Sequence, residues 1–188
     1  MTAKAPTRCI ALLRGVNVGR AKRVAMADLR ALIEDLGHSD VRTLLNSGNA
    51  VFRASRQDPP QIAAAIEGGI EDRFGFSASV VVLTARELDA IVAENPLPQA
   101  ARDPSRFLVA FVSTATTLAK ARPLLAQAWA PDALAIGRRA AYLWCARGFI
   151  ESKLAQAFAR VAADAATTRN WATVLKLQTA ARAGENAG

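Results

Sequence analysis

Residues 14–23 combine two glycines with four cations and contain no carboxylate. Gly15 and Gly19 allow the backbone to approach a bound group closely, and Asn17 between them adds an amide. Successive backbone N–H groups in such a loop form a nest for phosphate or carboxylate. The spacing matches neither a P-loop nor a dinucleotide fingerprint. We interpret the loop as a candidate anion site, the alternative being a solvated loop whose glycines serve its turns.

Two further segments carry polar groups suited to the same ligand. Residues 46–49 are a strong hairpin signal, and their side chains either cap backbone groups or bind a ligand. Residues 167–170 precede an expected helix, so they either cap and dock that helix or direct a guanidinium toward an anion. The candidate ligand-binding residues are Arg14, Gly15, Asn17, Gly19, Ser47, Gly48, Asn49, Thr168, Arg169 and Asn170.

Residue types for catalysis or metal binding are scarce. His38 is the single histidine, so a Ser-His-Asp triad or a His/Cys metal centre lacks its usual partners. Cys9 and Cys145 lie in apolar runs, which favours buried thiols over a disulfide, a metal site or a nucleophile. We predict no metal and no cofactor. No catalytic residue is identified, and whether the protein is an enzyme stays open.

Hydrophobic periodicity predicts the order β-α-β-β-α-β for the first half of the chain. The first helix ends at Gly37 as a C-cap, and Thr84 with Glu87 forms a capping box for the third. Strands are expected at 8–13, 41–45, 50–53 and 78–83, and helices at 26–36, 59–74 and 84–93.

The second half repeats this pattern after a linker with internal prolines, although no sequence repeat is evident. A helix stands where a fourth strand would complete it. Strands are expected at 106–112, 133–136 and 140–145, and helices at 117–129, 151–165 and 170–181. The expected organisation is an N-terminal subdomain with a trailing helix (1–94), a linker (95–105), a C-terminal subdomain (106–182) and a disordered tail (183–188).

These elements predict an α+β fold of two ferredoxin-like (split β-α-β) subdomains with an additional C-terminal helix. In such a unit the first two strands run parallel with the third inserted between them. Their C-terminal ends therefore share one edge of the sheet. Residues 14–24, residues 46–49 and the start of the first helix should converge there, and a helix start favours anions.

Composition bounds the partners of this chain. Its 188 residues carry 24 Lys+Arg against 16 Asp+Glu, a formal net charge of +8. The basic residues are 19 Arg and 5 Lys. Together with the abundant alanine, this usage is typical of genome-wide compositional bias, so the total charge is weak evidence for an anionic partner. Residues 1–6 lack the apolar region of a signal peptide, and no run is apolar enough for a membrane span. We therefore expect a cytoplasmic protein with no membrane partner.

Several motifs together resemble the family catalogued as domain of unknown function 1697. They are residues 13–19, Met26 with Leu29-Arg30, Ser47-Gly48-Asn49 before Val51-Phe52, Gly148 before residues 152–154, and residues 168–171 with 173–177. Arg20 departs from this pattern, where the family often has a second glycine, and so does Ala172, where an asparagine is usual. The resemblance spans residues 7–177. It implies a soluble bacterial α+β protein with two ferredoxin-like subdomains and no established reaction, and it favours one site built from the three segments.

Three hypotheses follow for function. The leading one is a protein that binds a small anionic ligand, such as a nucleotide or phosphorylated metabolite, at the glycine-containing loop edge. The second is a nucleic-acid-binding module that uses a basic arginine face, although no strand carries an RNA-recognition signature. The third is a structural or interaction protein whose motifs serve subdomain packing. The sequence does not indicate the oligomeric state.

Overall fold

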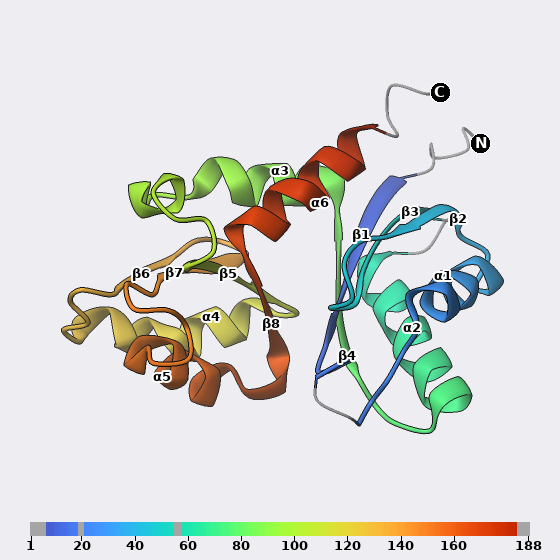
Figure 1. Cartoon of the computed structure of the whole chain (residues 1–188), viewed down its shortest axis with the longest axis horizontal. Coiled ribbons are helices and arrows are strands. Elements are labelled where there is room, and N and C mark those ends of the chain that lie inside the picture. Colours follow the sequence, from blue (N-terminus) through green and yellow to red (C-terminus); the bar gives the residue numbers. More distant parts are fainter. Residues whose placement is uncertain (1–6, 19–20, 55–57, 184–188) are drawn as a thin grey trace. The chain divides into compact units, whose positions relative to one another are not determined.

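The structure is a computed structural model that describes residues 7–18, 21–54 and 58–183 (Figure 1). The chain divides into two compact units. Unit 1 holds residues 1–88 and 177–188, and unit 2 holds residues 89–176. Two helices pass from one unit into the other along the chain, α3 (Ala85–Glu94) and α6 (Trp171–Ala183).

Unit 1 contains a four-stranded sheet in the order β2-β3-β1-β4. Neighbouring strands are antiparallel throughout, so β1 and β2 run parallel with β3 inserted between them. This order and polarity are those expected of a split β-α-β unit. Its elements are β1 (Thr7–Arg14), α1 (Met26–Asp35), β2 (Ser39–Thr43), β3 (Asn49–Ala54), α2 (Pro59–Phe74) and β4 (Ser79–Thr84).

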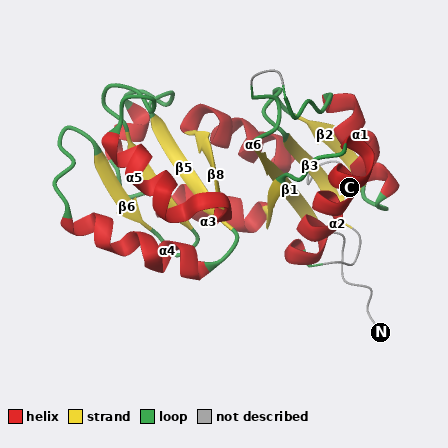
Figure 2. Ribbon diagram, turned by 90° about the horizontal axis from the view of Figure 1, so that it is seen from below, coloured by secondary structure: helices red, strands yellow, loops and turns green. Residues whose placement is uncertain are grey.

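The core of unit 1 lies between this sheet and its two helices (Figure 2). Side chains alternate along a strand, so every second residue of β1 faces the helices. Leu29 and Ile33 of α1 and Ile62, Ile66 and Ile70 of α2 recur at helical spacing and are fully buried there. Burial of these side chains anchors both helices, and the ends of β1 and β2 are fixed with them.

Unit 2 has the same topology, with a sheet in the order β6-β7-β5-β8 and only antiparallel neighbours. The α+β class expected from sequence is confirmed. Its elements are η1 (Pro98–Ala101), β5 (Phe107–Val112), α4 (Ala115–Ala121), η2 (Arg122–Ala126), β6 (Ala133–Ile136), β7 (Ala140–Trp144), α5 (Lys153–Ala162), η3 (Ala163–Ala165) and β8 (Ala166–Asn170).

The expectation that a helix replaces the fourth strand of the second half is wrong. β8 pairs with β5 from Ala166 opposite Val112 to Asn170 opposite Leu108. The β-branched Thr167 favours a strand, but five residues are too few for an alternating pattern to stand out beside the longer helix that follows. Thr168 is consequently a strand residue and not a helix cap.

The helices of unit 2 are shorter than their periodicity predicts. The helix expected at 117–129 is α4 followed by the 3₁₀ turn η2, because Pro123 lacks the N–H that would continue the α-helix. The helix expected at 151–165 starts at Lys153, since Ser152 is its N-cap, and ends at Ala162. In both segments, apolar residues beyond the ends of the helix keep the helical spacing, and this is why the sequence predicts longer helices.

Helices α4 and α5 pack on one face of the unit 2 sheet. The opposite face carries the second part of α3 (Figure 1). Tyr142 on β7 is fully buried, and its hydroxyl donates to the carbonyl of Ile91 at 2.7 Å. At the end of α3, the Glu94 carboxylate accepts from the backbone N–H of Arg138. These contacts attach α3 to the β6–β7 hairpin.

Candidate functional site

The β1–α1 loop and the β2–β3 turn lie at the same edge of the unit 1 sheet, as the topology predicts. β1 and β2 end there, and β3 begins there. The backbone N–H of Leu13 at the end of β1 donates to the carbonyl of Gly48 in the turn at 2.8 Å. We call this part of unit 1, residues 14–18, 21–25 and 44–48, the loop edge.

Asn17 is the side chain that joins the two segments. Its Nδ2 donates to the carbonyl of Val24 at 2.8 Å and to that of Asn46 at 2.8 Å, and its Oδ1 accepts from the N–H of Val24 at 2.9 Å. Its backbone φ is 58°, a left-handed conformation that asparagine tolerates better than most residues. Asn17 therefore closes the loop on itself and ties it to the turn.

The turn residues are committed to packing and to hydrogen bonds within the turn. A Cβ on Gly48 would lie 2.6 Å from Cγ2 of Val16 and 2.7 Å from Cβ of Leu13, so glycine permits this close approach. The fully buried Asn49 donates from Nδ2 to the carbonyl of Leu44 at 2.8 Å and to Oγ of Ser47 at 2.9 Å. These contacts give the loop edge a fixed shape.

The exposed charged groups among the described residues of the loop edge are basic, and they lie beside the exposed apolar side chains of Val18 and Leu45. Arg23 is exposed and forms no ion pair with any described residue, and Arg14 is half-buried. Lys22 donates from Nζ to the carbonyl of Ser77 at 3.2 Å and lies 5.9 Å from the centre of the Phe76 ring, which holds it against this edge. Gly15 has a φ of 72° with open space around it, and Ser47 is exposed. Gly19 lies outside the described residues.

Helix α1 begins at the loop edge without a side-chain cap. Ala25 at its N-cap offers no acceptor to the N–H groups of the first turn. Asp28 lies in that first turn and supplies one negative charge. The other described helices of eight or more residues have side-chain caps, from Asp58 for α2, Thr84 for α3, Ser152 for α5 and Asn170 for α6.

The third candidate segment belongs to unit 2. Thr168 is exposed on β8, and Asn170 caps α6 by accepting from the N–H of Thr173 at 2.9 Å. Arg169 is paired across the sheet with Val109 and is buried, and its Nη1 donates to Oγ1 of Thr167 and to the carbonyl of Thr168. Burial lowers the pKa of this guanidinium to about 10. The assignment of this segment to a ligand stays a prediction.

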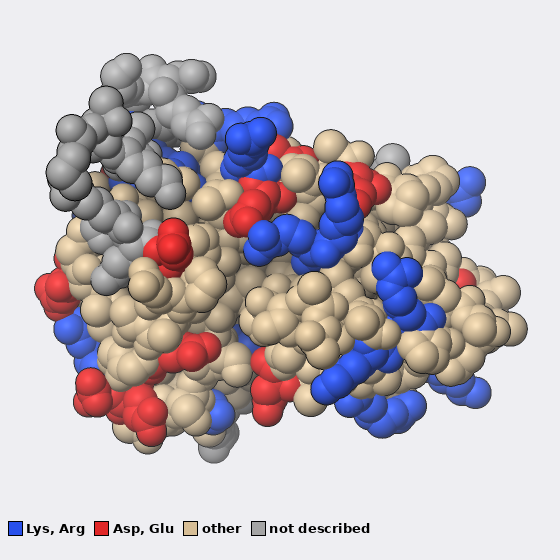
Figure 3. All heavy atoms as spheres, turned by 180° about the vertical axis from the view of Figure 1, so that it is seen from behind, with Lys and Arg blue, Asp and Glu red and all other residues tan. Residues whose placement is uncertain are grey.

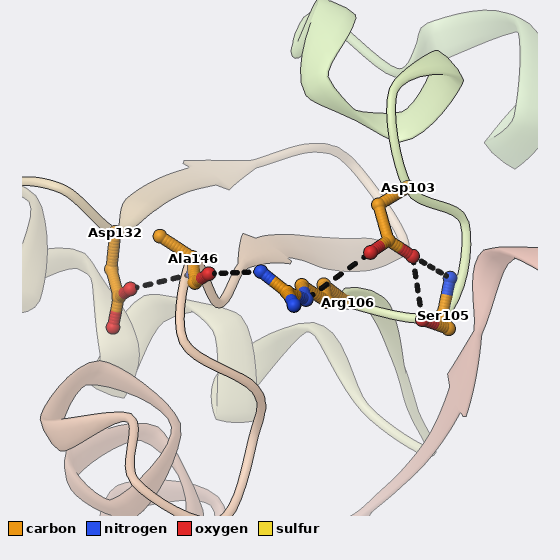
Figure 4. A network of polar contacts seen from close by, with 5 residues as sticks. All are labelled: Asp103, Ser105, Arg106, Asp132 and Ala146. Carbon is orange, nitrogen blue, oxygen red and sulfur yellow. Dashed lines mark hydrogen bonds and ion pairs between the residues drawn. The ribbon is translucent and has the colours of Figure 1, made fainter.

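A polar network in unit 2 is invisible in the sequence because its members are far apart along the chain (Figure 4). The backbone of Ala146 donates to Oδ1 of Asp132 and accepts from Arg106, which also pairs with Asp103. Asp132 further accepts from Oγ of Ser152, the N-cap of α5. The network fixes the loop between β7 and α5. Ser152 before an apolar helical run was the signal available for this cap.

Both cysteines are free and buried, one in each unit. Burial, with a smaller contribution from Glu87, raises the pKa of the Cys9 thiol to about 11, and burial also raises the pKa of Cys145. Both thiols are therefore protonated at neutral pH, and a thiolate is the reactive form. We expect a thiol reagent such as Ellman's reagent to label neither cysteine in the native protein and both in denaturant. Rapid native labelling of either one would contradict this placement.

Comparison with known proteins supports the fold and supplies no activity. A solved structure described as the conserved bacterial protein SP0830 from Streptococcus pneumoniae is 22% identical, with a TM-score of 0.74, over 94% of this chain and 99% of that chain. At this identity the likeness shows the fold alone. No curated protein matches the chain. Within the described residues, no helix is long and apolar enough to cross a bilayer.

The family comparison agrees with the motifs of the loop edge. The matching segment begins at Thr7 and ends at Tyr142, so it includes all of residues 13–19 and 47–52. Residues 168–177, which also resemble the family, lie beyond the matched segment. The chain belongs to the family described as protein of unknown function (DUF1697), whose model matches residues 7–142.

Proposed function

We propose that the loop edge of unit 1 binds a small molecule through a phosphate or carboxylate group. The observation that carries this proposal is the uncapped start of α1 beside Arg23. The first N–H groups of a helix and its dipole favour a negative charge, and an arginine strengthens a hydrogen bond to an oxyanion. No carboxylate occurs in residues 14–25 or 44–48 to occupy this position.

The hydrogen bonds of the loop edge support the proposal because they arrange the binding groups in advance. Asn17 holds the loop that carries Lys22 and Arg23, and it also holds the turn that presents Ser47. A site whose backbone is already ordered loses less conformational entropy when a ligand binds. In this proposal Arg14, Gly15 and Ser47 face the ligand, whereas Asn17, Gly48 and Asn49 position the loops.

The charge of Arg23 provides the first test. We expect inorganic phosphate and nucleoside monophosphates to raise the melting temperature of the protein, because a ligand of the folded state stabilises it. Arg23→Gln should weaken this binding about tenfold, the size typical of a lost charge-assisted hydrogen bond. Arg30→Gln removes the same charge from the middle of α1, where Arg30 pairs with Glu34 at 2.9 Å, and should leave the binding constant unchanged. Equal effects of the two variants, or no binding by the wild type, would refute the proposal.

Asp28 provides a test with the opposite sign. Its carboxylate lies in the first turn of α1 and repels an anion at the helix start. Asp28→Asn should therefore tighten phosphate binding by about two- to fivefold, corresponding to the 0.3–1 kcal/mol typical of a charge near a helix terminus. Isothermal titration at low ionic strength measures the change. Weaker binding by this variant would place the ligand elsewhere.

A further inference from the structure

The helix layers of the two units have opposite charge although their topology is the same. The bounds of α1 and α2 contain two arginines and six carboxylates, a net charge of −4. Those of α4, η2 and α5 contain four cations and no carboxylate, a net charge of +4. Lys and Arg likewise predominate over unit 2 on the face shown in Figure 3. A uniform compositional bias would charge both layers alike, so the basic layer of unit 2 is a local feature.

The cations of this layer are available to a partner. Lys120, Arg122, Lys153 and Arg160 are exposed, and none forms an ion pair with a described residue. In the unit 1 layer, by contrast, both arginines are paired, Arg30 with Glu34 at 2.9 Å and Arg73 with Asp35 at 2.7 Å.

Lys153 and Arg160 form a stripe along α5. They are seven residues apart, so they lie on the same side of the helix about 10 Å apart along its axis. Gln156 lies between them and is exposed. Lys120 lies in the last turn of α4 and Arg122 is the C-cap of that helix, which packs alongside α5 (Figure 1). Both helices cover the same face of the unit 2 sheet, and their exposed cations belong to this one helix layer.

An aromatic ring lies at the start of the stripe. Phe149 is 56% exposed in the loop that precedes α5, beside the exposed Arg147. The loop is held in place because Gly148 N–H donates to the carbonyl of Cys145 at 2.9 Å and Gln156 Nε2 donates to that of Ile150 at 3.1 Å. Because this loop is already held in place, a ligand that binds the Phe149 ring has little loop entropy to remove.

We propose that this surface of unit 2 binds single-stranded nucleic acid. The cations of α4, η2 and α5 contact successive phosphates, and one base stacks on Phe149. Unpaired cations beside an exposed aromatic ring are the combination that single strands require, and a single strand exposes its bases for stacking. Glu151, between Phe149 and the stripe, is the one carboxylate in residues 147–160 and limits the affinity.

The phosphate contacts are tested by salt dependence. We expect a fluorescent single-stranded oligonucleotide of mixed sequence to bind the full chain with an affinity that falls linearly, on logarithmic axes, with salt. The double variant Lys153→Gln, Arg160→Gln should reduce the slope by about 1.4, because single strands give about 0.7 per phosphate contact. Arg30→Gln with Arg73→Gln removes the same charge from the unit 1 layer and should leave the slope unchanged. Equal losses in both variants would indicate net charge alone and overturn the proposal.

Stacking is tested by two neighbouring truncations. Phe149→Ala should weaken single-strand binding about fivefold or more at constant salt slope, as expected for loss of one stacked base. Ile150→Ala removes an adjacent side chain that is 76% exposed and should have no effect. Phe149→Trp should retain the affinity and show tryptophan quenching on binding. Each of these variants is on the surface, so native circular dichroism is expected for all of them.

Other partners give different results. If the surface instead docks on anionic membranes, phosphatidylserine vesicles bind the protein, and Phe149→Ala and Ile150→Ala weaken that binding alike. If it contacts only duplex phosphates, Phe149→Ala leaves all nucleic-acid binding unchanged. Either result, or the absence of single-strand binding at low salt, would overturn the proposal. The loop-edge proposal rests on Arg23 in unit 1. The variants of Lys153, Arg160 and Phe149 in unit 2 therefore test the single-strand proposal independently of it.

Discussion

Gly48→Ala is expected to lower the free energy of unfolding of unit 1 by about 2–5 kcal/mol. The φ of Gly48 is 75°, a left-handed conformation that costs an L-residue about 1–2 kcal/mol. The added Cβ would also lie 2.7 Å from Cβ of Leu13, which is attached to the rigid backbone of β1. Relief of such an overlap typically costs a further ~1–3 kcal/mol. The loss is a large fraction of the stability of a small unit.

Gly15→Ala separates the two causes. Gly15 has nearly the same φ, 72°, but no atom within 4 Å of the position of an added Cβ. We expect a loss of only about 1–2 kcal/mol, the conformational cost alone. If Gly15→Ala and Gly48→Ala were equally destabilised, the close approach of the turn to β1 would be wrong.

The cysteines and aromatic residues allow the two units to be followed separately. The three tryptophans and the single tyrosine all lie in residues 129–171, within unit 2, so their fluorescence does not report on unit 1. Cys9 is buried in β1 of unit 1, and Cys145 is buried in unit 2. Thiol labelling of Cys9 across a denaturant series therefore measures the effect of Gly48→Ala, and Cys145 serves as the internal reference.

Asn17→Ala is expected to cost unit 1 about 2–4 kcal/mol and to abolish anion binding at the loop edge. Three side-chain hydrogen bonds are lost, each typically contributing about 1 kcal/mol, and alanine tolerates the φ of 58° less well. The carbonyls of Val24 and Asn46 lose their donor, so the loop and the turn separate. Labelling of Cys9 measures stability, and phosphate titration measures binding.

Asn46→Ala is the matched control. Asn46 contributes its backbone carbonyl to Asn17, and alanine supplies the same carbonyl. Its side chain is exposed, so we expect a change within about 0.5 kcal/mol and unaltered binding. If Asn17→Ala kept both full stability and full phosphate affinity, Asn17 would neither join the loops nor position the site.

Much of the fold was predictable because its signals are local. The hairpin at Asn46–Ser47–Gly48–Asn49 and the capping box of Thr84 with Glu87 depend on residues within a few positions of each other, and both occur as predicted. Strand β8 was missed because its stability comes from pairing with β5, whose residues lie more than fifty positions earlier. A pairing over that separation leaves no periodic pattern in a strand of five residues.

The meeting of two of the candidate segments at one sheet edge was predictable, but the hydrogen-bond partners of their residues were not. Topology alone puts residues 14–24 and 46–49 at one sheet edge, since parallel strands with one strand between them end together. Composition does not reveal whether an amide faces a ligand or its own backbone. Asn17 and Asn49 direct theirs to carbonyls of the loop edge, whereas Arg23 remains exposed.

The sequence by itself determines the α+β class, the order of most elements, the family and the acid-free basic loop. Each depends on neighbouring residue types or on spacing along a helix or strand. Tertiary structure decides which cations have partners. Arg73 pairs with Asp35, which lies 38 positions earlier in the chain, whereas Arg23, Lys153 and Arg160 form no ion pair with a described residue. Charge adds up along a sequence, but an ion pair requires two side chains to meet within about 4 Å, and only the folded chain brings them together.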